Sequence, residues 1–292
     1  MCFLAAAALA LMAHQPTFAS VPKLPPGSHR PKQQLGQSYL TDPNTIAKIV
    51  GSFQEACELR TESNCLSVLE LGPGLGALTR SLAELYPTNL LAVDVDPRAV
   101  AVLQKDLPNL KVRLQDLLTL NHAEVKLQMG SAPLFVVGNL PYSITTDALI
   151  SLVKYPGAIR YAQVMVQKEA ADRMAAAVGS KDYSVLSVML QAYTKVRQLY
   201  LVPPTAFYPQ PKVISSVVEL DFLDASKASA VNVETLLEVC KESFRQRKRV
   251  LKHSLKAYTQ KRRLPLPLRF AKLRAEQLTP SDFLELAMSM SR

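Results

Sequence analysis

Short apolar segments alternate with amphipathic ones through the middle of the chain, and this alternation limits the possible folds more than any other feature. Apolar runs of five or six residues are typical of buried strands. We expect strands in the segments 66–71, 90–95, 110–114, 134–138 and 163–167. Apolar residues at helical spacing follow the first two of these segments. Strands that alternate with helices predict an α/β fold with a doubly wound, mostly parallel sheet.

The flanks of this region show other patterns. The run 41–43 (Thr-Asp-Pro) places a cap residue and a proline where a helix should begin. The segment 213–222 alternates in part and predicts a late strand at the edge of the sheet. From about Val231 the spacing is helical to the end. We therefore expect three parts: a leader over 1–32, an α/β domain over 33–225 and a small helical domain over 226–292.

Charge and cysteine content restrict the partners. The 292 residues carry a net charge of +10, which calls for a polyanionic partner and most simply a nucleic acid. The four cysteines lack CxxC and His-paired spacing, so we expect structural thiols and no metal site.

The amino terminus is similar to a targeting leader. Residues 4–13 form an apolar run that is too short to span a bilayer and suits the core of a signal peptide, although no Lys or Arg precedes it. Residues 16–32 are rich in Pro and contain basic but no acidic residues. This order resembles the bipartite leaders of plastids bounded by extra membranes. We expect a plastid protein without stable membrane association. The alternatives are the mitochondrion, then the cytosol or nucleolus, or a disordered start without a signal.

A glycine-rich loop follows the first expected strand. Glu70 precedes residues 72–76 (Gly-Pro-Gly-Leu-Gly), where glycines let a ligand approach the backbone and a helix start adds its dipole. Such a loop also fits a dinucleotide. Two details favour S-adenosylmethionine. Glu70 could bind its ammonium group directly or through water, and Pro73 sits where a pyrophosphate-binding loop is usually more open.

Acidic residues end the next two expected strands. Asp94 can accept hydrogen bonds from both ribose hydroxyls. Asp116 can accept one from an adenine amine, while the backbone N–H of Leu117 donates to the ring. Asp96 is better placed to cap the following helix. Each aspartate alone could be a helix cap, but with the glycine loop they predict an adenosyl cofactor at one edge of the sheet.

Asn139, Leu140, Pro141 and Tyr142 follow the fourth expected strand. The amine of adenine is a poor nucleophile because its lone pair is delocalised into the ring. The Asn139 amide oxygen and the carbonyl of Leu140 or Pro141 could accept its hydrogens and draw the lone pair out of conjugation. The ring of Tyr142 could hold the base by its face. A simple turn is the alternative.

Five segments together are similar to those of one family. They are 36–40 (GQSYL), 70–79 (ELGPGLGALT), 139–146 (NLPYSITT), 202–213 (VPPTAFYPQPKV) and 244–255 (FRQRKRVLKHSL). The chain resembles the ribosomal RNA adenine dimethyltransferases, which dimethylate two adjacent adenosines near the 3′ end of small-subunit rRNA. The resemblance runs from about residue 32 to the end.

The resemblance implies a Rossmann-like S-adenosylmethionine-dependent methyltransferase sheet with a small C-terminal helical domain, acting as a monomer without a metal. It implies that Phe207 holds the target adenine opposite Tyr142, beside the catalytic residues Asn139, Leu140 and Pro141. It places the cofactor against Gln37, Tyr39, Leu40, Glu70, Gly72, Gly74, Gly76, Asp94, Val95, Asp116, Leu117 and Asn139.

Three positions depart from the family pattern. Asp94 stands where Glu is usual, Gln115 replaces a Gly, and Ser38 replaces an Asn. None of these changes removes a group that the chemistry needs, so we expect activity to be retained.

Basic residues crowd between 241 and 274. Such a run is often only a solvated helix face. Beside a base-modifying site it predicts a surface for the phosphates of small-subunit rRNA or of the precursor small subunit. The expected RNA contacts are Arg245, Arg247, Lys248, Arg249 and Lys252.

Two other functions compete with this one. A resistance methyltransferase acting on large-subunit rRNA is disfavoured by the fit of 202–213 and 244–255. An organellar transcription or assembly factor that binds nucleic acid without turnover would show erosion of the glycine loop or of Asn-Leu-Pro-Tyr. Both motifs are intact here.

Overall fold

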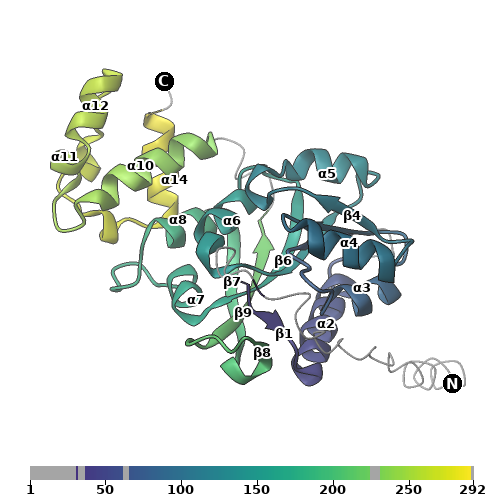
Figure 1. The fold of residues 1–292 in the computed structure, drawn as a ribbon. Helices are drawn as coiled ribbons and strands as arrows, with labels where there is room; N and C mark the ends of the chain where they lie inside the picture. The colour runs from purple at the N-terminus through teal and green to yellow at the C-terminus, as the bar shows by residue number, and fades with distance from the viewer. Residues whose placement is uncertain (1–30, 32–36, 62–65, 224–230, 291–292) are drawn as a thin grey trace, which may run out of the picture.

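The computed structural model describes residues 31, 37–61, 66–223 and 231–290 (Figure 1). Seven strands form one sheet in the order β4-β3-β2-β5-β6-β9-β7. They are β2 (Ser67–Leu71), β3 (Leu90–Asp94), β4 (Lys111–Leu114), β5 (Leu134–Asn139), β6 (Ile159–Gln167), β7 (Thr194–Val202) and β9 (Ser215–Phe222). The pairs from β4 to β6 are parallel, and β9 runs antiparallel to both its neighbours.

Helices cover both faces of this sheet. They are α2 (Pro43–Glu58), α3 (Thr79–Leu85), α4 (Pro97–Asp106), α5 (His122–Gln128), α6 (Thr145–Leu152), α7 (Lys168–Met174) and α8 (Val185–Gln191). Successive residues of β2 point to opposite faces, so Val68 joins one apolar cluster and Leu69 the other. The expected doubly wound, mostly parallel sheet is confirmed.

Helix α2 begins where the sequence predicts. The side chain of Asp42 accepts a hydrogen bond from the backbone N–H of Thr45 at 2.8 Å, and Pro43 fills the first turn. The buried face of the helix includes Ile46 and Phe53, which pack against the sheet. This helix therefore anchors the segment that precedes it.

The prediction that the late strand lies at the sheet edge was wrong. Strand β9 lies between β6 and β7, and its first six residues are buried. The edge is β7, which the sequence reasoning missed. Most of its residues are exposed or partly exposed, among them Lys195 and Arg197, so its composition does not resemble that of a buried strand.

A second, small sheet consists of two strands with two residues each. β1 (Tyr39–Leu40) pairs antiparallel with β8 (Phe207–Tyr208). The backbone N–H groups of Thr41 and Asp42 also donate to the carbonyl of Ala206, at 2.8 and 3.2 Å. The segment 39–42 is thereby joined to a loop more than 160 residues further along the chain.

The helical C-terminal region expected from about Val231 is present. It contains α10 (Val233–Arg245), α11 (Leu251–Ser254), α12 (Lys256–Arg262), α13 (Leu268–Ala271) and α14 (Pro280–Ser289). These helices lie at one end of the molecule, next to α8 (Figure 1). One apolar cluster continues from the sheet through α8 into α10 and α14. The predicted boundary at 225/226 lies outside the described residues, and the division into two domains stays a prediction.

Short 3-10 helices occupy several of the connections: η2 (Leu117–Thr119), η3 (Tyr142–Ile144), η4 (Pro204–Ala206) and η5 (Ala275–Gln277). Within the described part of the chain, no helix is long and apolar enough to cross a membrane. The expected leader, residues 1–32, lies almost entirely outside that part.

Candidate active site

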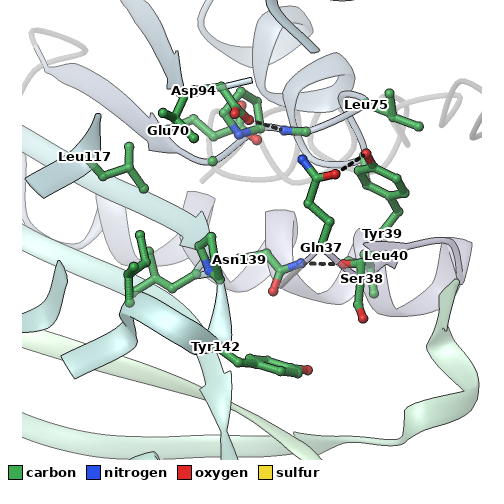
Figure 2. A pocket seen from close by; sticks show the side chains of 18 of the residues that line it. Gln37, Ser38, Tyr39, Leu40, Glu70, Leu75, Asp94, Leu117, Asn139 and Tyr142 are labelled. Carbon is green, nitrogen blue, oxygen red and sulfur yellow. Dashed lines mark hydrogen bonds between the residues drawn. The ribbon is translucent and has the colours of Figure 1, made fainter. Parts of the chain in front are cut away.

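A pocket lies at the carboxyl ends of β2 to β5, and the segment 37–41 lines one side of it (Figure 2). Fourteen predicted site residues line this pocket: Gln37, Tyr39, Leu40, Glu70, Gly72, Gly74, Asp94, Val95, Asp116, Leu117, Asn139, Leu140, Pro141 and Tyr142. Two predicted residues, Gly76 and Phe207, do not line it. The fold therefore brings together nearly all of the positions that the sequence singled out.

The glycine loop leaves room for a ligand at Gly74. Its φ is +55°, and its N–H donates to Asp94 Oδ2 at 3.0 Å. A Cβ at this position would lie 3.3 Å from the ring of Tyr39, so a side chain would crowd the pocket wall. Gly74 is needed both for its backbone conformation and for the space beside it.

Gly76 does not line the pocket and packs against α4. Its φ is +88°, and a Cβ would lie 2.8 Å from Leu103 Cδ2 on α4. The residue faces that helix and not the pocket, so it permits close packing of the loop on α4. The sequence pattern could not separate this packing glycine from the ligand-facing ones.

Glu70 is buried in the pocket wall without a full set of partners. It is 1% exposed, and among the described residues its Oε2 has no hydrogen-bond partner. Burial raises the pKa of its carboxyl from 4.5 to about 8, and the nearby Asp94 carboxylate adds to the rise. A buried carboxyl with one open oxygen fits the ammonium group of S-adenosylmethionine, since a cation would stabilise its ionised form.

Asp94 is held rigidly at the end of β3. Its Oδ2 accepts from Gly74 N–H at 3.0 Å, and its Oδ1 accepts from Asp96 N–H at 2.8 Å. The side chain is 6% exposed, and burial raises the pKa of its carboxyl. Each oxygen retains a second lone pair, so this fixed carboxylate fits the two ribose hydroxyls that the sequence assigned to it.

Asp116 and Leu117 lie across the pocket at the end of β4. The Oδ1 of Asp116 accepts from the backbone N–H of Leu118 at 2.9 Å, which caps η2. The residue is exposed, while Leu117 is buried with its side chain toward the pocket (Figure 2). This arrangement fits an adenine ring that lies against Leu117 with its amine near Asp116.

Asp96 does more than cap a helix. It accepts from the backbone N–H of Arg98 at 3.1 Å, as predicted for the N-cap of α4. It also accepts from Gln37 Nε2 at 3.1 Å, and the hydroxyl of Tyr39 donates to Gln37 Oε1 at 3.0 Å. The Arg98 guanidinium holds the pKa of this carboxyl well below its usual range. Asp96 therefore fixes the segment that lines the pocket.

The amide of Asn139 is oriented by the same segment. Its Nδ2 donates to the backbone carbonyl of Ser38 at 3.4 Å, a hydrogen bond visible in Figure 2. The amide oxygen is then the atom left to accept from a substrate. No side-chain pattern could reveal this contact, because the acceptor at Ser38 belongs to the backbone.

The structure also decides between the two candidate carbonyls. The carbonyl of Pro141 already accepts from Ile144 N–H at 3.2 Å and from Thr145 Oγ1 at 2.9 Å. Among the described residues, no hydrogen bond is made to the carbonyl of Leu140. The carbonyl of Leu140 is therefore the one of the two that is left open to accept from an amine, next to the Asn139 amide.

Tyr142 projects from η3 on the Asn139 side of the pocket (Figure 2). Its hydroxyl and Ser215 Oγ lie 2.7 Å apart in a hydrogen bond, and burial raises the pKa of the phenol. Ser215 begins β9, 73 residues further along the chain. It fixes the ring without touching the pocket, and sequence reasoning missed it.

Phe207 is not a pocket residue in this structure. It is 4% exposed and packs in the apolar cluster below the β1–β8 pair, opposite Leu40. In this position its ring presents no free face to a base. The expected stacking of Phe207 on the target adenine stays a prediction.

The five predicted RNA contacts differ in their surroundings. Arg247 is engaged within the protein: it donates to Glu276 Oε2 at 2.7 Å and to the carbonyls of Ser180 and Lys181 at 2.7 and 2.6 Å. It ties the helical region to a loop of the α/β part. Arg245 pairs with Glu242 at 3.6 Å but remains largely exposed.

Lys248, Arg249 and Lys252 are exposed, and none of them forms an ion pair with a described residue. These three remain available to phosphates. Among the described residues, no group of three or more His, Cys, Asp or Glu side chains is arranged to hold a metal ion.

Known proteins are similar to this chain over most of its length. The ribosomal RNA small subunit methyltransferase A of Salinibacter ruber is 36% identical over 258 residues, which are 88% of this chain and 84% of that protein. The protein of the same name from Photorhabdus laumondii is 38% identical over 231 residues, 78% of this chain and 81% of that protein.

Solved structures show the same fold. A dimethyladenosine transferase from Plasmodium falciparum matches with a TM-score of 0.65 and 24% identity, over 85% of this chain and 95% of that one. The 23S rRNA methyltransferase ErmE matches with a TM-score of 0.56 and 26% identity, over 87% of this chain and 100% of that one. Residues 28–291 match the family described as ribosomal RNA adenine dimethylase. This chain therefore belongs to the ribosomal RNA adenine dimethylase family, whose S-adenosylmethionine-dependent methyltransferase fold it shares.

Proposed function

We propose that this S-adenosylmethionine-dependent rRNA adenine dimethyltransferase acts on two adjacent adenosines near the 3′ end of small-subunit rRNA. The observation that carries the proposal is the pair of acceptors at the end of β5. The Asn139 amide oxygen and the Leu140 carbonyl are both left open, beside a pocket that fits the cofactor. Curated relatives named small subunit methyltransferase A support this choice of subunit.

The residues act on the amine by position and polarity. The cofactor supplies an electrophilic methyl group. The two acceptors hold the amine hydrogens, so the nitrogen lone pair leaves conjugation with the ring and can point toward that methyl group. No strong base is needed, because the amine becomes acidic as it acquires the methyl group. The oriented ring of Tyr142 supplies a face for the base.

The test is methyl transfer in vitro by the full-length chain. Labelled S-adenosylmethionine is supplied with small ribosomal subunits that lack adenosine dimethylation, and in parallel with large subunits. We expect label at two adjacent adenosines of the small subunit only. Asn139→Ala should lose roughly 100-fold or more in rate, by analogy with loss of one preorganised polar group.

Asn121→Ala is the matched control, because Asn121 caps α5 away from the pocket. It should keep the wild-type rate. Label on large subunits would refute the proposed substrate. Subunit and cofactor binding without any transfer would replace the proposal by an assembly-factor role.

We also propose that the protein acts in a plastid and as a monomer. The apolar run 4–13 and the basic, acid-free stretch 16–32 support the plastid. Residues 1–40 fused to a fluorescent protein should give plastid fluorescence, and a diffuse cytosolic signal would refute this. Light scattering should give a mass close to 32.1 kDa for a monomer of the full chain.

A further inference from the structure

Tyr208 is an exposed aromatic residue beside the pocket, and the site described above gives it no task. It is 55% exposed. Its side chain makes no hydrogen bond and no ring contact with the described residues. A large, flat and half-open side chain at such a place is available to a ligand.

The pairing of β1 and β8 places this ring at the pocket rim. Tyr208 lies opposite Tyr39, and Phe207 lies opposite Leu40. Directly paired residues of antiparallel strands share a face. Leu40 and Phe207 share the buried face, so Tyr39 and Tyr208 share the other. Tyr39 faces the glycine loop of the pocket, since a Cβ on Gly74 would lie 3.3 Å from its ring, so Tyr208 on the same face continues outward from this pocket wall.

Exposed apolar and basic side chains follow Tyr208 along the chain. Val213 and Ile214 are 41% and 43% exposed. Ile214 directly precedes Ser215, whose hydroxyl is bonded to Tyr142. Lys212 is exposed and has no ion pair with a described residue. This combination of aromatic, apolar and basic groups suits a nucleic-acid strand better than a protein partner.

A base-modifying enzyme takes its target out of the stack, which leaves the adjacent base without a stacking partner. We propose that Tyr208 is an RNA-contact residue whose ring stacks on the base of a nucleotide next to the target adenosine. The inference rests on the proposed function. It gives this chain a base platform outside the pocket, at the position that follows the buried Phe207.

The experiment measures the dissociation constant of the full-length protein for small ribosomal subunits lacking adenosine dimethylation, by filter binding. Tyr208→Phe keeps the ring, Tyr208→Leu keeps an apolar side chain without a flat face, and Tyr208→Ala removes both. Leu59→Ala is the matched control, since Leu59 is 83% exposed at the end of α2 and does not line the pocket. Melting temperature and cofactor affinity are measured for each protein.

We expect the Ala and Leu variants to bind subunits about 5- to 100-fold more weakly, as expected for loss of one base stack. The Phe variant and Leu59→Ala should stay within about twofold of the wild type, with melting temperature and cofactor affinity unchanged. Wild-type affinity in Tyr208→Ala would overturn the inference. The inference would also be overturned if Tyr208→Leu bound subunits as tightly as Tyr208→Phe, or if the variants lost affinity only for the cofactor.

Methyl transfer by the wild type is followed in the same preparations. If the wild type binds subunits but transfers no methyl group, the proposed function fails, while the order of affinities among the Tyr208 variants still decides the stacking inference. If transfer occurs and the variants bind like the wild type, only the stacking inference fails.

Discussion

Replacing Glu70 with Gln should make the protein more stable and its cofactor binding weaker. The pKa of the Glu70 carboxyl is about 8 in the folded protein, against 4.5 without burial. Because folding raises this pKa, the contribution of the protonated carboxyl to stability is fully present below pH 4.5 and is lost as the pH rises toward 8. Each pH unit in this window costs about 1.4 kcal/mol. At pH 7 the buried carboxyl therefore costs on the order of 3 kcal/mol.

Glu70→Gln removes this cost because an amide does not ionise. Urea unfolding of the cofactor-free protein should show the variant more stable by up to about 3 kcal/mol at pH 7, with the advantage shrinking toward pH 5. In thermal unfolding, a difference of this size raises the melting temperature by roughly 5–10 °C. Calorimetry should show weaker binding of S-adenosylmethionine by about 10-fold or more, since a charged hydrogen bond is lost.

Glu219→Gln is the matched control. Glu219 is also buried, but it accepts from Arg197 and Tyr161. Its replacement should lower stability. The reasoning about Glu70 would be refuted if Glu70→Gln were no more stable than the wild type at pH 7, or if it kept the same dependence of stability on pH.

Three further outcomes follow from the packing. Gly76→Ala should lower the free energy of unfolding by about 1–3 kcal/mol, because the new Cβ would clash with Leu103 and the residue would keep a positive φ. An unchanged melting temperature would contradict this. Arg247→Ala should lower the melting temperature, whereas Lys248→Ala should leave it unchanged and reduce the salt slope of subunit binding by about 1. If Lys248→Ala lowered the melting temperature and Arg247→Ala changed only the salt slope, Lys248 would be the structural residue and Arg247 the phosphate contact. Asp96→Ala should lower the free energy of unfolding by about 1 kcal/mol, because α4 loses its N-cap, and should raise the KM for the cofactor. A KM equal to that of the wild type would refute the positioning role of Asp96.

The sheet and the acidic strand ends could be predicted because both depend on local pattern. Buried strands have apolar composition, and parallel strands bring their carboxyl ends to one edge. Glu70, Asp94 and Asn139 therefore meet in the pocket as expected. Strand β7 was missed because it is an edge strand. Edge strands carry polar residues, which obscure the alternation of apolar and polar side chains.

Other features depend on contacts between distant segments. Phe207 is buried because β8 pairs with β1, and nothing near residue 207 in the sequence signals that partner. Arg247 lies in a basic run, and only the fold brings Glu276 and the carbonyl of Ser180 to it. The orientation of the Asn139 amide depends on a backbone carbonyl, which every residue has.

The contacts of the segment 37–42 have a consequence for the order of events during synthesis. Asn139 bonds to Ser38 across 101 residues, and Thr41 bonds to Ala206 across 165. Contacts between such distant residues form late, because the intervening chain must first be made and arranged. A nascent chain that ends before Ala206, or one that has lost the segment 37–42, cannot form these contacts. The pocket wall therefore depends on a short segment near residue 40 that must stay joined to the rest of the fold.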